Sequence, residues 1–186
     1  MFFAMGCVGE NINEKTGNGS LGSISVERYS DNIYQVLKAH RTAYAKLIIK
    51  RLALNHKVIK ATESWKSEKA LLLPAQMFRE TAHLLRDADV DVDFSLLSLW
   101  PINRHNVPKS SAEKKGLEFV RKNPNLKYYD KEKIGPQTFF VGVYPDNAVS
   151  TACVSCHNTH IKSPKRNFAL GDNMGAIVIR IPISGS

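Results

Sequence analysis

The segment that most restricts how this chain can fold is the pentapeptide Cys153-Val154-Ser155-Cys156-His157. Two thiols in Cys-x-x-Cys spacing, followed directly by an imidazole, form the attachment pattern of c-type haem. The thiols bond to the two vinyl groups of the porphyrin, and the His lies under the ring plane, where it can ligate iron. The chain has 3 Cys and 6 His in 186 residues, and this composition produces the pattern by chance in on the order of one chain in 700. We therefore predict one covalently attached haem c, held by Cys153 and Cys156, with His157 as an axial iron ligand.

Two other uses of a Cys-x-x-Cys pair fit the sequence less well. A zinc site needs four ligands, and Cys7 is the only other thiol in the chain. A thioredoxin-like redox pair lies at a strand-to-helix turn near the start of a βαβ unit, whereas this pair lies near the C-terminal end. Covalent haem is the favoured interpretation, with zinc binding and thiol redox chemistry as the alternatives.

Length and charge restrict the class of protein further. A chain of 186 residues that is 43% apolar and 23% charged is typical of one globular domain. No stretch approaches the roughly 18 consecutive apolar residues of a membrane-spanning helix. The net charge of +9 attracts acidic partners, but its basic residues are too dispersed for a nucleic-acid-binding arm. We expect an acidic redox-partner protein or a small gas ligand as the partner, and no nucleic acid.

The expected site of haem attachment sets the expected location of the protein. Attachment of this kind takes place outside the cytoplasmic membrane, so we predict a periplasmic or extracytoplasmic bacterial protein. Residues 1–6 lack a basic region and are too short for the apolar region of a signal peptide. Ala4-Met5-Gly6-Cys7 resembles the end of a lipoprotein signal, so a lipid anchor on Cys7 is one interpretation. The others are a remnant of the N-terminus and a haem or intermolecular role for this thiol.

The first third of the chain predicts a leader and one long helix. Residues 1–23 are rich in Gly, Asn and Ser and are expected to be a flexible leader, with residues 24–186 forming a single domain. A helix is predicted over 24–56, because apolar side chains recur at alternating spacings of three and four. The stripe comprises Val26, Tyr29, Ile33, Val36, His40, Ala43 and Leu47, with Leu37, Tyr44, Ile48 and Leu52 beside it. This helix either packs on its own domain or forms a homodimer seam.

The rest of the chain predicts short helices and strands. Pro74 can begin a helix whose apolar face carries Met77, Phe78, Ala82, Leu84 and Leu85. Residues 89–100 alternate polar and apolar side chains like a strand. A capped helix is expected over 111–120, strands over 137–144 and 175–183, and one helical turn at the haem motif. The predicted fold class is α+β with an antiparallel sheet and flanking helices.

Several further segments strengthen the interpretation of the motif, because they recur in one family. They are Leu73-Pro74-Ala75, Ser98 with Pro101-x-Asn103-Arg104, Lys133-Ile134-Gly135, Ala152 to His160, Ser163-Pro164-Lys165 and Gly171-Asp172-x-x-Gly175. With them the chain resembles the c-type haem sensor domain family, formerly a domain of unknown function, found alone or as the periplasmic input module of bacterial receptor cyclases and kinases. The resemblance implies a PAS-like sheet that cradles one haem behind a long helix. Relatives carry a Met where this chain has Ala148 and an Arg where it has Asn173-Met174, so no contact transfers to these positions.

The other contacts to the haem are expected from few residues. The distal axial candidates are Met77 and His83, because the resemblance places the Pro74 helix near the pocket. His40, His56, His105, Met174 and Cys7 are alternatives. Arg104, Lys162 and Lys165 are candidates for contacts to the haem propionates, and His160 is expected to be a neighbour of the site and not a second ligand.

The function predicted from these features is that of an exported monohaem c-type cytochrome, acting in electron transfer or in redox or gas (NO, CO) sensing. No Gly-rich phosphate loop and no Ser-His-Asp arrangement is present, and no kinase or cyclase sequence follows Ile183. A sensor would therefore act through dimerisation or docking. The alternative is a haem enzyme of the peroxidase type. We expect a weak or displaceable distal ligand, because no His or Met stands at a position that demands ligation.

Overall fold

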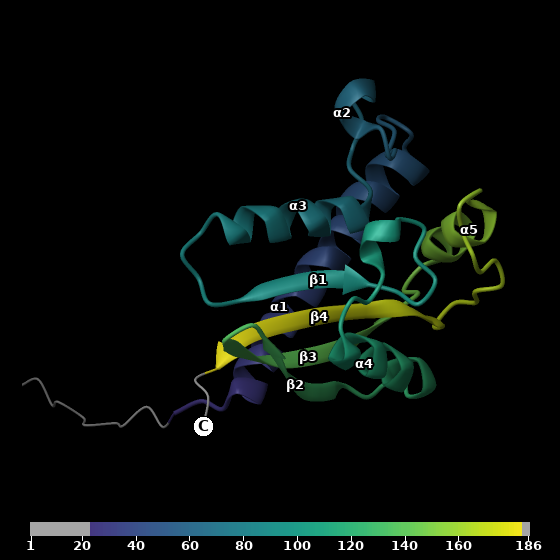
Figure 1. Ribbon diagram of the computed structural model, residues 1–186. Helices are drawn as coiled ribbons and strands as arrows, with labels where there is room; N and C mark the ends of the chain where they lie inside the picture. The colour runs from purple at the N-terminus through teal and green to yellow at the C-terminus, as the bar shows by residue number, and fades with distance from the viewer. Residues whose placement is uncertain (1–22, 184–186) are drawn as a thin grey trace, which may run out of the picture.

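The structure is a computed structural model that describes residues 23–183. Its centre is an antiparallel sheet of four strands in the order β1-β4-β3-β2 (Figure 1). The strands are β1 (Asp93–Leu97), β2 (Tyr128–Ile134), β3 (Gln137–Asn147) and β4 (Asn173–Ile183). With a long N-terminal helix across the sheet, this architecture confirms the predicted α+β class. The leader and Cys7 lie outside the described residues.

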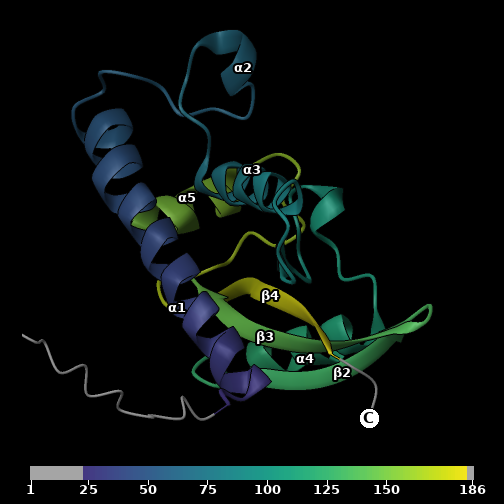
Figure 2. The ribbon, with the colours of Figure 1, turned by 90° about the vertical axis from the view of Figure 1, so that its left-hand side faces the viewer.

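Helices cover both faces of the sheet. The long helix comprises α1 (Val26–Ala43) and a π-helical continuation, η1 (Tyr44–Asn55). It lies on the same face as α3 (Pro74–Arg86), and α4 (Ser111–Lys122) lies on the opposite face (Figure 2). The remaining helices are α2 (Trp65–Glu68), the short 3-10 helix η2 (Arg104–Asn106) and α5 (Thr151–Thr159). Among residues 23–183, no helix has the length and apolar character needed to cross a bilayer.

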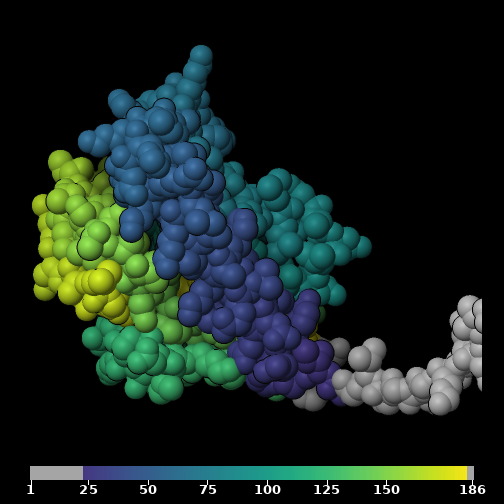
Figure 3. All heavy atoms as spheres, turned by 180° about the vertical axis from the view of Figure 1, so that it is seen from behind, coloured from purple at the N-terminus to yellow at the C-terminus, as the bar shows by residue number. Residues whose placement is uncertain are grey.

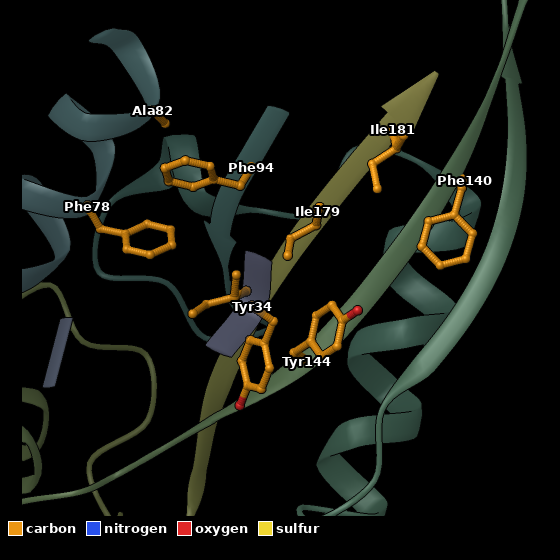
Figure 4. Close-up of a cluster of buried hydrophobic side chains, with 9 residues drawn as sticks. Tyr34, Phe78, Ala82, Phe94, Phe140, Tyr144, Ile179 and Ile181 are labelled. Carbon is orange, nitrogen blue, oxygen red and sulfur yellow. The ribbon is translucent and has the colours of Figure 1, made fainter. Parts of the chain in front are cut away.

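The core is divided between the two faces because successive strand residues point to opposite sides. On β4, Ile177, Ile179 and Ile181 contribute to the cluster under α1 and α3, whereas Ala176 and Val178 contribute to the cluster under α4. Figure 4 shows the first cluster, in which Tyr34 of α1 meets Tyr144 of β3. Their rings are stacked with centroids 4.3 Å apart, so this pair joins the long helix to the sheet.

The buried stripe of α1 differs from the predicted one. Val36 is 68% exposed and Leu47 63% exposed, and His40 and Ala43 are also exposed. The buried side of α1 instead contains Ser30 and Tyr34, with Leu37 packed behind them. The exposed part of the predicted stripe is therefore free of the domain's own core, as the homodimer alternative requires.

The other predicted elements are mostly correct, with three differences. The strand expected over 89–100 is shorter and comprises only β1. It ends before Ser98, whose hydroxyl donates to the Met174 carbonyl (2.7 Å) and accepts from Trp100 N (3.0 Å). Leu84 is 71% exposed and is not part of the apolar face of α3. Strand β2 and the short helices α2 and η2 were not predicted. The helix over 111–120 is confirmed as α4, which begins with a capping box between Ser110 and Glu113.

Candidate functional site

The Cys-x-x-Cys-His segment lies on α5, which follows β3 and projects beyond the end of the sheet (Figure 1). Ser150 caps its N-terminus, because the Ser150 hydroxyl accepts a bond from the backbone N–H of Cys153. Residues three and four apart lie on one face of a helix. The α-helical conformation therefore places Cys153, Cys156 and His157 on a single side of α5. The helical turn expected at the motif is confirmed, and it extends to nine residues.

A loop that returns to the sheet holds α5 in place. The side-chain amide of Asn158 donates to the Phe168 carbonyl and accepts from Phe168 N, both at 2.9 Å. Phe168 is 4% exposed and forms a small buried cluster with Ala148 and Met174, against which Cys153 packs. The ring of His157 meets the ring of Phe168 edge to face, with centroids 5.8 Å apart. These contacts fix the orientation of the imidazole.

His157 is a partly buried imidazole whose hydrogen bonding is incomplete. Its Nδ1 atom is buried and has no hydrogen-bond partner among the described residues. Burial lowers the pKa of His157, Asp146 opposes this shift, and Arg41 and His160 add to it. A neutral imidazole is the form that binds metals. A buried polar atom without a partner is uncommon in proteins. Here it indicates that the imidazole has bonding capacity left for a ligand.

The two thiols of the motif differ in environment. Cys153 is partly buried, and its Sγ lies 3.2 Å from the Ser150 hydroxyl. Cys156 is exposed, and partial desolvation, with smaller contributions from Glu63 and Cys153, raises its pKa. Both are free thiols, as attachment to a vinyl group requires.

A cavity of about 60 Å³ lies between α1, the end of β3 and α5, beside Cys153. Figure 3 shows from behind how α1 crosses the molecule beside the segment that carries α5. The lining combines apolar side chains with the charged groups of Lys38, Arg41 and Asp146. Its residues are Tyr34, Lys38, Arg41, Thr42, Ala45, Pro74, Pro145, Asp146, Val149, Cys153 and Ile177. Small-molecule pockets measure roughly 300–1,000 Å³, so a macrocycle needs this crevice to widen.

The structure places the two predicted distal candidates differently. Pro74, at the start of α3, lines the cavity. Met77 is about 60° from Pro74 around the helix axis, whereas His83 is about 180° away. His83 is half-exposed, and its Nδ1 lies 3.8 Å from Glu80. Met77 is thus on the same side of α3 as the cavity, and His83 is on the opposite side.

The alternative distal ligands also lie in different environments. Met174 is 8% exposed and packs in the cluster that supports α5, whereas His40, His56 and His105 are exposed. His160 has a partner of its own, because its Nε2 lies 3.2 Å from Glu63. Its role as a neighbour of the site agrees with this position.

The three predicted propionate contacts lie outside the cavity lining. Arg104 and Lys162 are exposed. The ammonium group of Lys165 lies 4.4 Å from the ring centroids of both Trp100 and Phe168. These aromatic faces already stabilise its charge.

Sequence reasoning missed the charged residues that do line the cavity. Arg41 and Asp146 form an ion pair between α1 and the end of β3. They are 105 positions apart in the chain, so no local pattern could bring them together. The only available signal was an arginine on the side of α1 that also carries Tyr34, two helical turns earlier.

The fold and the site define a class of protein, namely an α+β domain in which a long N-terminal helix and a Cys-x-x-Cys-His helix border one crevice. Residues 23–182 match the model of the Tll0287-like family. The chain therefore belongs to the Tll0287-like family.

A solved structure agrees with this membership. The chain is similar to the crystal structure of the cyanobacterial haem protein Tll0287, with a TM-score of 0.55 and 16% sequence identity. The similarity covers 88% of this chain and 100% of that chain, and at this identity it shows the fold alone. No curated protein matches the sequence.

Proposed function

We propose that this protein is a monohaem c-type cytochrome in which Cys153 and Cys156 bind the porphyrin and His157 binds the iron. The observation that carries the proposal is the geometry of α5. One helix face presents both thiols and an imidazole, Cys153 lines a crevice, and the buried Nδ1 of His157 has no partner among the described residues. Membership of the Tll0287-like family supports it, because a solved protein of similar fold is a haem protein.

The residues around the crevice fit an amphiphilic macrocycle. Apolar side chains from α1, α3 and the sheet line the crevice and would exclude water from a bound ring, and Lys38 and Arg41 add positive charge to the lining. Phe168 contacts the imidazole edge to face, and burial lowers the pKa of His157, which favours the neutral form that binds metals. When bound, the haem supplies a one-electron redox centre and a site for diatomic ligands.

The first test is the mass of the protein after export and cytochrome c maturation in a bacterial host. We expect the polypeptide plus one haem, about 616 Da, retained after extraction with acidified acetone. Replacement of both Cys153 and Cys156 by Ser should abolish this adduct, and the control Cys7→Ser should retain it. A wild-type protein that loses its haem in the acetone step would contradict covalent attachment.

Within this function, the crevice favours ligand or redox sensing over simple electron transfer. Among the described residues, no His or Met that could be a second ligand lines the crevice; Met77 lies on the same side of α3 but outside this lining. A strong second ligand keeps iron six-coordinate, whereas a weak one leaves it open to CO or NO. We expect the reduced protein to bind CO within minutes, with a shift of the Soret band. A low-spin ferrous spectrum unchanged under saturating CO would favour electron transfer.

The proposed location is the bacterial periplasm or another extracytoplasmic space, because thioether attachment takes place there. The net charge of +9 favours an acidic redox partner. Fractionation of the native host followed by haem staining of denaturing gels tests the location. A haem-stained band of this mass in the cytoplasmic fraction alone would contradict it.

A further inference from the structure

The guanidinium group of Arg41 occupies an unusual position for an arginine on a long exposed helix. Only 21% of its side chain is exposed, and it lines the crevice beside Cys153. Burying a charge of this kind is costly unless partners compensate it. The hydrogen-bond partners of the Arg41 guanidinium therefore indicate which ligand this part of the crevice can bind.

One edge of this guanidinium is used and another edge is not. The Nη1 atom donates to the Asp146 carboxylate, whose side chain is 14% exposed. The Nε atom is buried and has no hydrogen-bond partner among residues 23–183. Asp146 thus fixes the plane of the group, and the Nε edge keeps an unpaired donor. A guanidinium edge matches a carboxylate, which can accept two parallel hydrogen bonds from it.

The charges nearby favour an anion at this edge. Lys38, one helical turn before Arg41, also lines the crevice, so two cations face one carboxylate there. The hydroxyl of Tyr34 donates to the Pro145 carbonyl at 3.3 Å, so it is not a partner for Arg41. The remaining lining is mainly apolar. A ligand with a flat apolar body and carboxylate arms fits both parts.

We propose that Arg41, oriented by Asp146, binds a propionate of the haem, and that these two residues form the carboxylate end of the crevice. The proposal rests on the proposed function. It assigns the propionate contact to a residue that lines the crevice, whereas Arg104, Lys162 and Lys165 lie outside this lining. Arg41 contacts the ligand directly, whereas Asp146 acts as a positioning residue through Arg41.

The first experiment separates the carboxylates from the macrocycle. The full chain, produced without haem attachment and kept reduced, is titrated with iron mesoporphyrin IX and with its dimethyl ester. Neither porphyrin has vinyl groups, so no thioether forms. We expect Arg41→Gln to weaken binding of the diacid roughly 10- to 100-fold, the usual range for a charge-assisted hydrogen bond, and to leave binding of the diester unchanged. Equal losses for both porphyrins, or no loss for either, would overturn the assignment.

The second experiment measures the midpoint potential of the haem-loaded protein in two variants, one that removes a positive charge and one that removes a negative charge. A cation near the iron favours the ferrous state and an anion favours the ferric state. Arg41→Gln should therefore lower the midpoint potential, and Asp146→Asn should raise it. Arg41→Lys, which keeps the charge but not the planar edge, should keep the potential and lose part of the diacid affinity. A variant that merely disturbs packing has no reason to produce opposite shifts.

Arg86→Gln is the matched control, because Arg86 forms an ion pair with Asp93 (3.4 Å) on the surface and does not line the crevice. Potentials of Arg41→Gln and Asp146→Asn that shift in the same direction, or no more than that of Arg86→Gln, would overturn the assignment of Arg41 while the haem remains bound. A matured wild-type protein without haem would instead overturn the proposed function itself. The two failures are thus distinguishable.

Discussion

Replacement of Tyr34 by Ala tests how the long helix is held on the sheet and, with it, how one wall of the crevice is formed. Tyr34 is 8% exposed and stacks on Tyr144 at 4.3 Å with an interplanar angle of 11°. It also lines the crevice. Loss of this ring removes the main aromatic contact between α1 and β3, so we expect both a stability loss and a weaker haem site.

The magnitude follows from the contacts that are lost. Truncation of a buried large aromatic side chain costs about 3–5 kcal/mol, a range that includes the ~0.5–1.5 kcal/mol of an aromatic pair. The Tyr34 hydroxyl donates one bond to the Pro145 carbonyl at 3.3 Å, worth ~0.5–1.5 kcal/mol. Domains are stable by only about 5–15 kcal/mol. Tyr34→Ala should therefore remove a large part of the free energy of unfolding, and Tyr34→Phe only the hydrogen-bond contribution.

Urea unfolding of the haem-loaded protein, followed by circular dichroism, measures these differences. Tyr29→Ala is the control, since Tyr29 lies on the same helix and is 42% exposed. Surface substitutions of this kind usually change stability by less than about 0.5 kcal/mol. If Tyr34→Ala unfolds at the same urea concentration as Tyr29→Ala, the stacked pair does not hold α1, and the argument is wrong.

Three further substitutions test other parts of the fold. Gly175→Ala should lower the melting temperature by several degrees or prevent folding, because a Cβ atom there would lie 2.3 Å from the Leu97 carbonyl oxygen, a clash that β1 can relieve only by moving. For Asp31, burial raises the pKa, but hydrogen bonds from one lysine and two tyrosines outweigh it and hold the pKa below 3.8. The stability this carboxylate contributes is present above pH 3.8 and is lost as the pH falls through the lowered value, so the urea midpoints of wild type and Asp31→Asn should converge in acid. Asn158→Ala should speed protease cleavage near α5, because both bonds to Phe168 are lost, and unchanged cleavage would show that α5 is held otherwise.

Periodic patterns predicted the elements of this fold but not all of their faces. The apolar spacing correctly indicated a helix over 24–56, yet Val36 and Leu47 are exposed. The buried side includes the polar residues Ser30 and Arg41, which apolar periodicity cannot register. Ser30 is fully buried, and a hydrogen bond from the Tyr144 hydroxyl at 2.7 Å offsets the cost of burying its own hydroxyl. Partners more than 100 positions away thus decide which side of α1 faces the sheet.

Strand β2 shows a related limit. Its sequence, Tyr128 to Ile134, contains four charged residues and lacks the apolar alternation of a half-buried strand. It lies at the edge of the sheet and pairs with β3 alone. There Lys131 and Lys133 remain exposed and discourage pairing with other chains, whereas Glu132 is satisfied by Arg180. The motif on α5, in contrast, was predictable, because its chemistry depends on the spacing of nearby residues, which can be read from the sequence.

Widening of the crevice must separate α1 from α5, and the contacts on each side indicate which one moves. The helix α1 is fixed by buried aromatic stacking and by the Tyr144–Ser30 bond. The helix α5 has no fully buried residue; it is held by the Asn158–Phe168 pair of bonds and by partly buried contacts of Cys153 and Val154 with the cluster around Phe168. Segments with few buried apolar contacts open at the lowest free-energy cost. We therefore expect that entry of a macrocycle would displace α5 while α1 and the sheet stay in place, so that the residues of α1 would already be oriented when the ligand arrives.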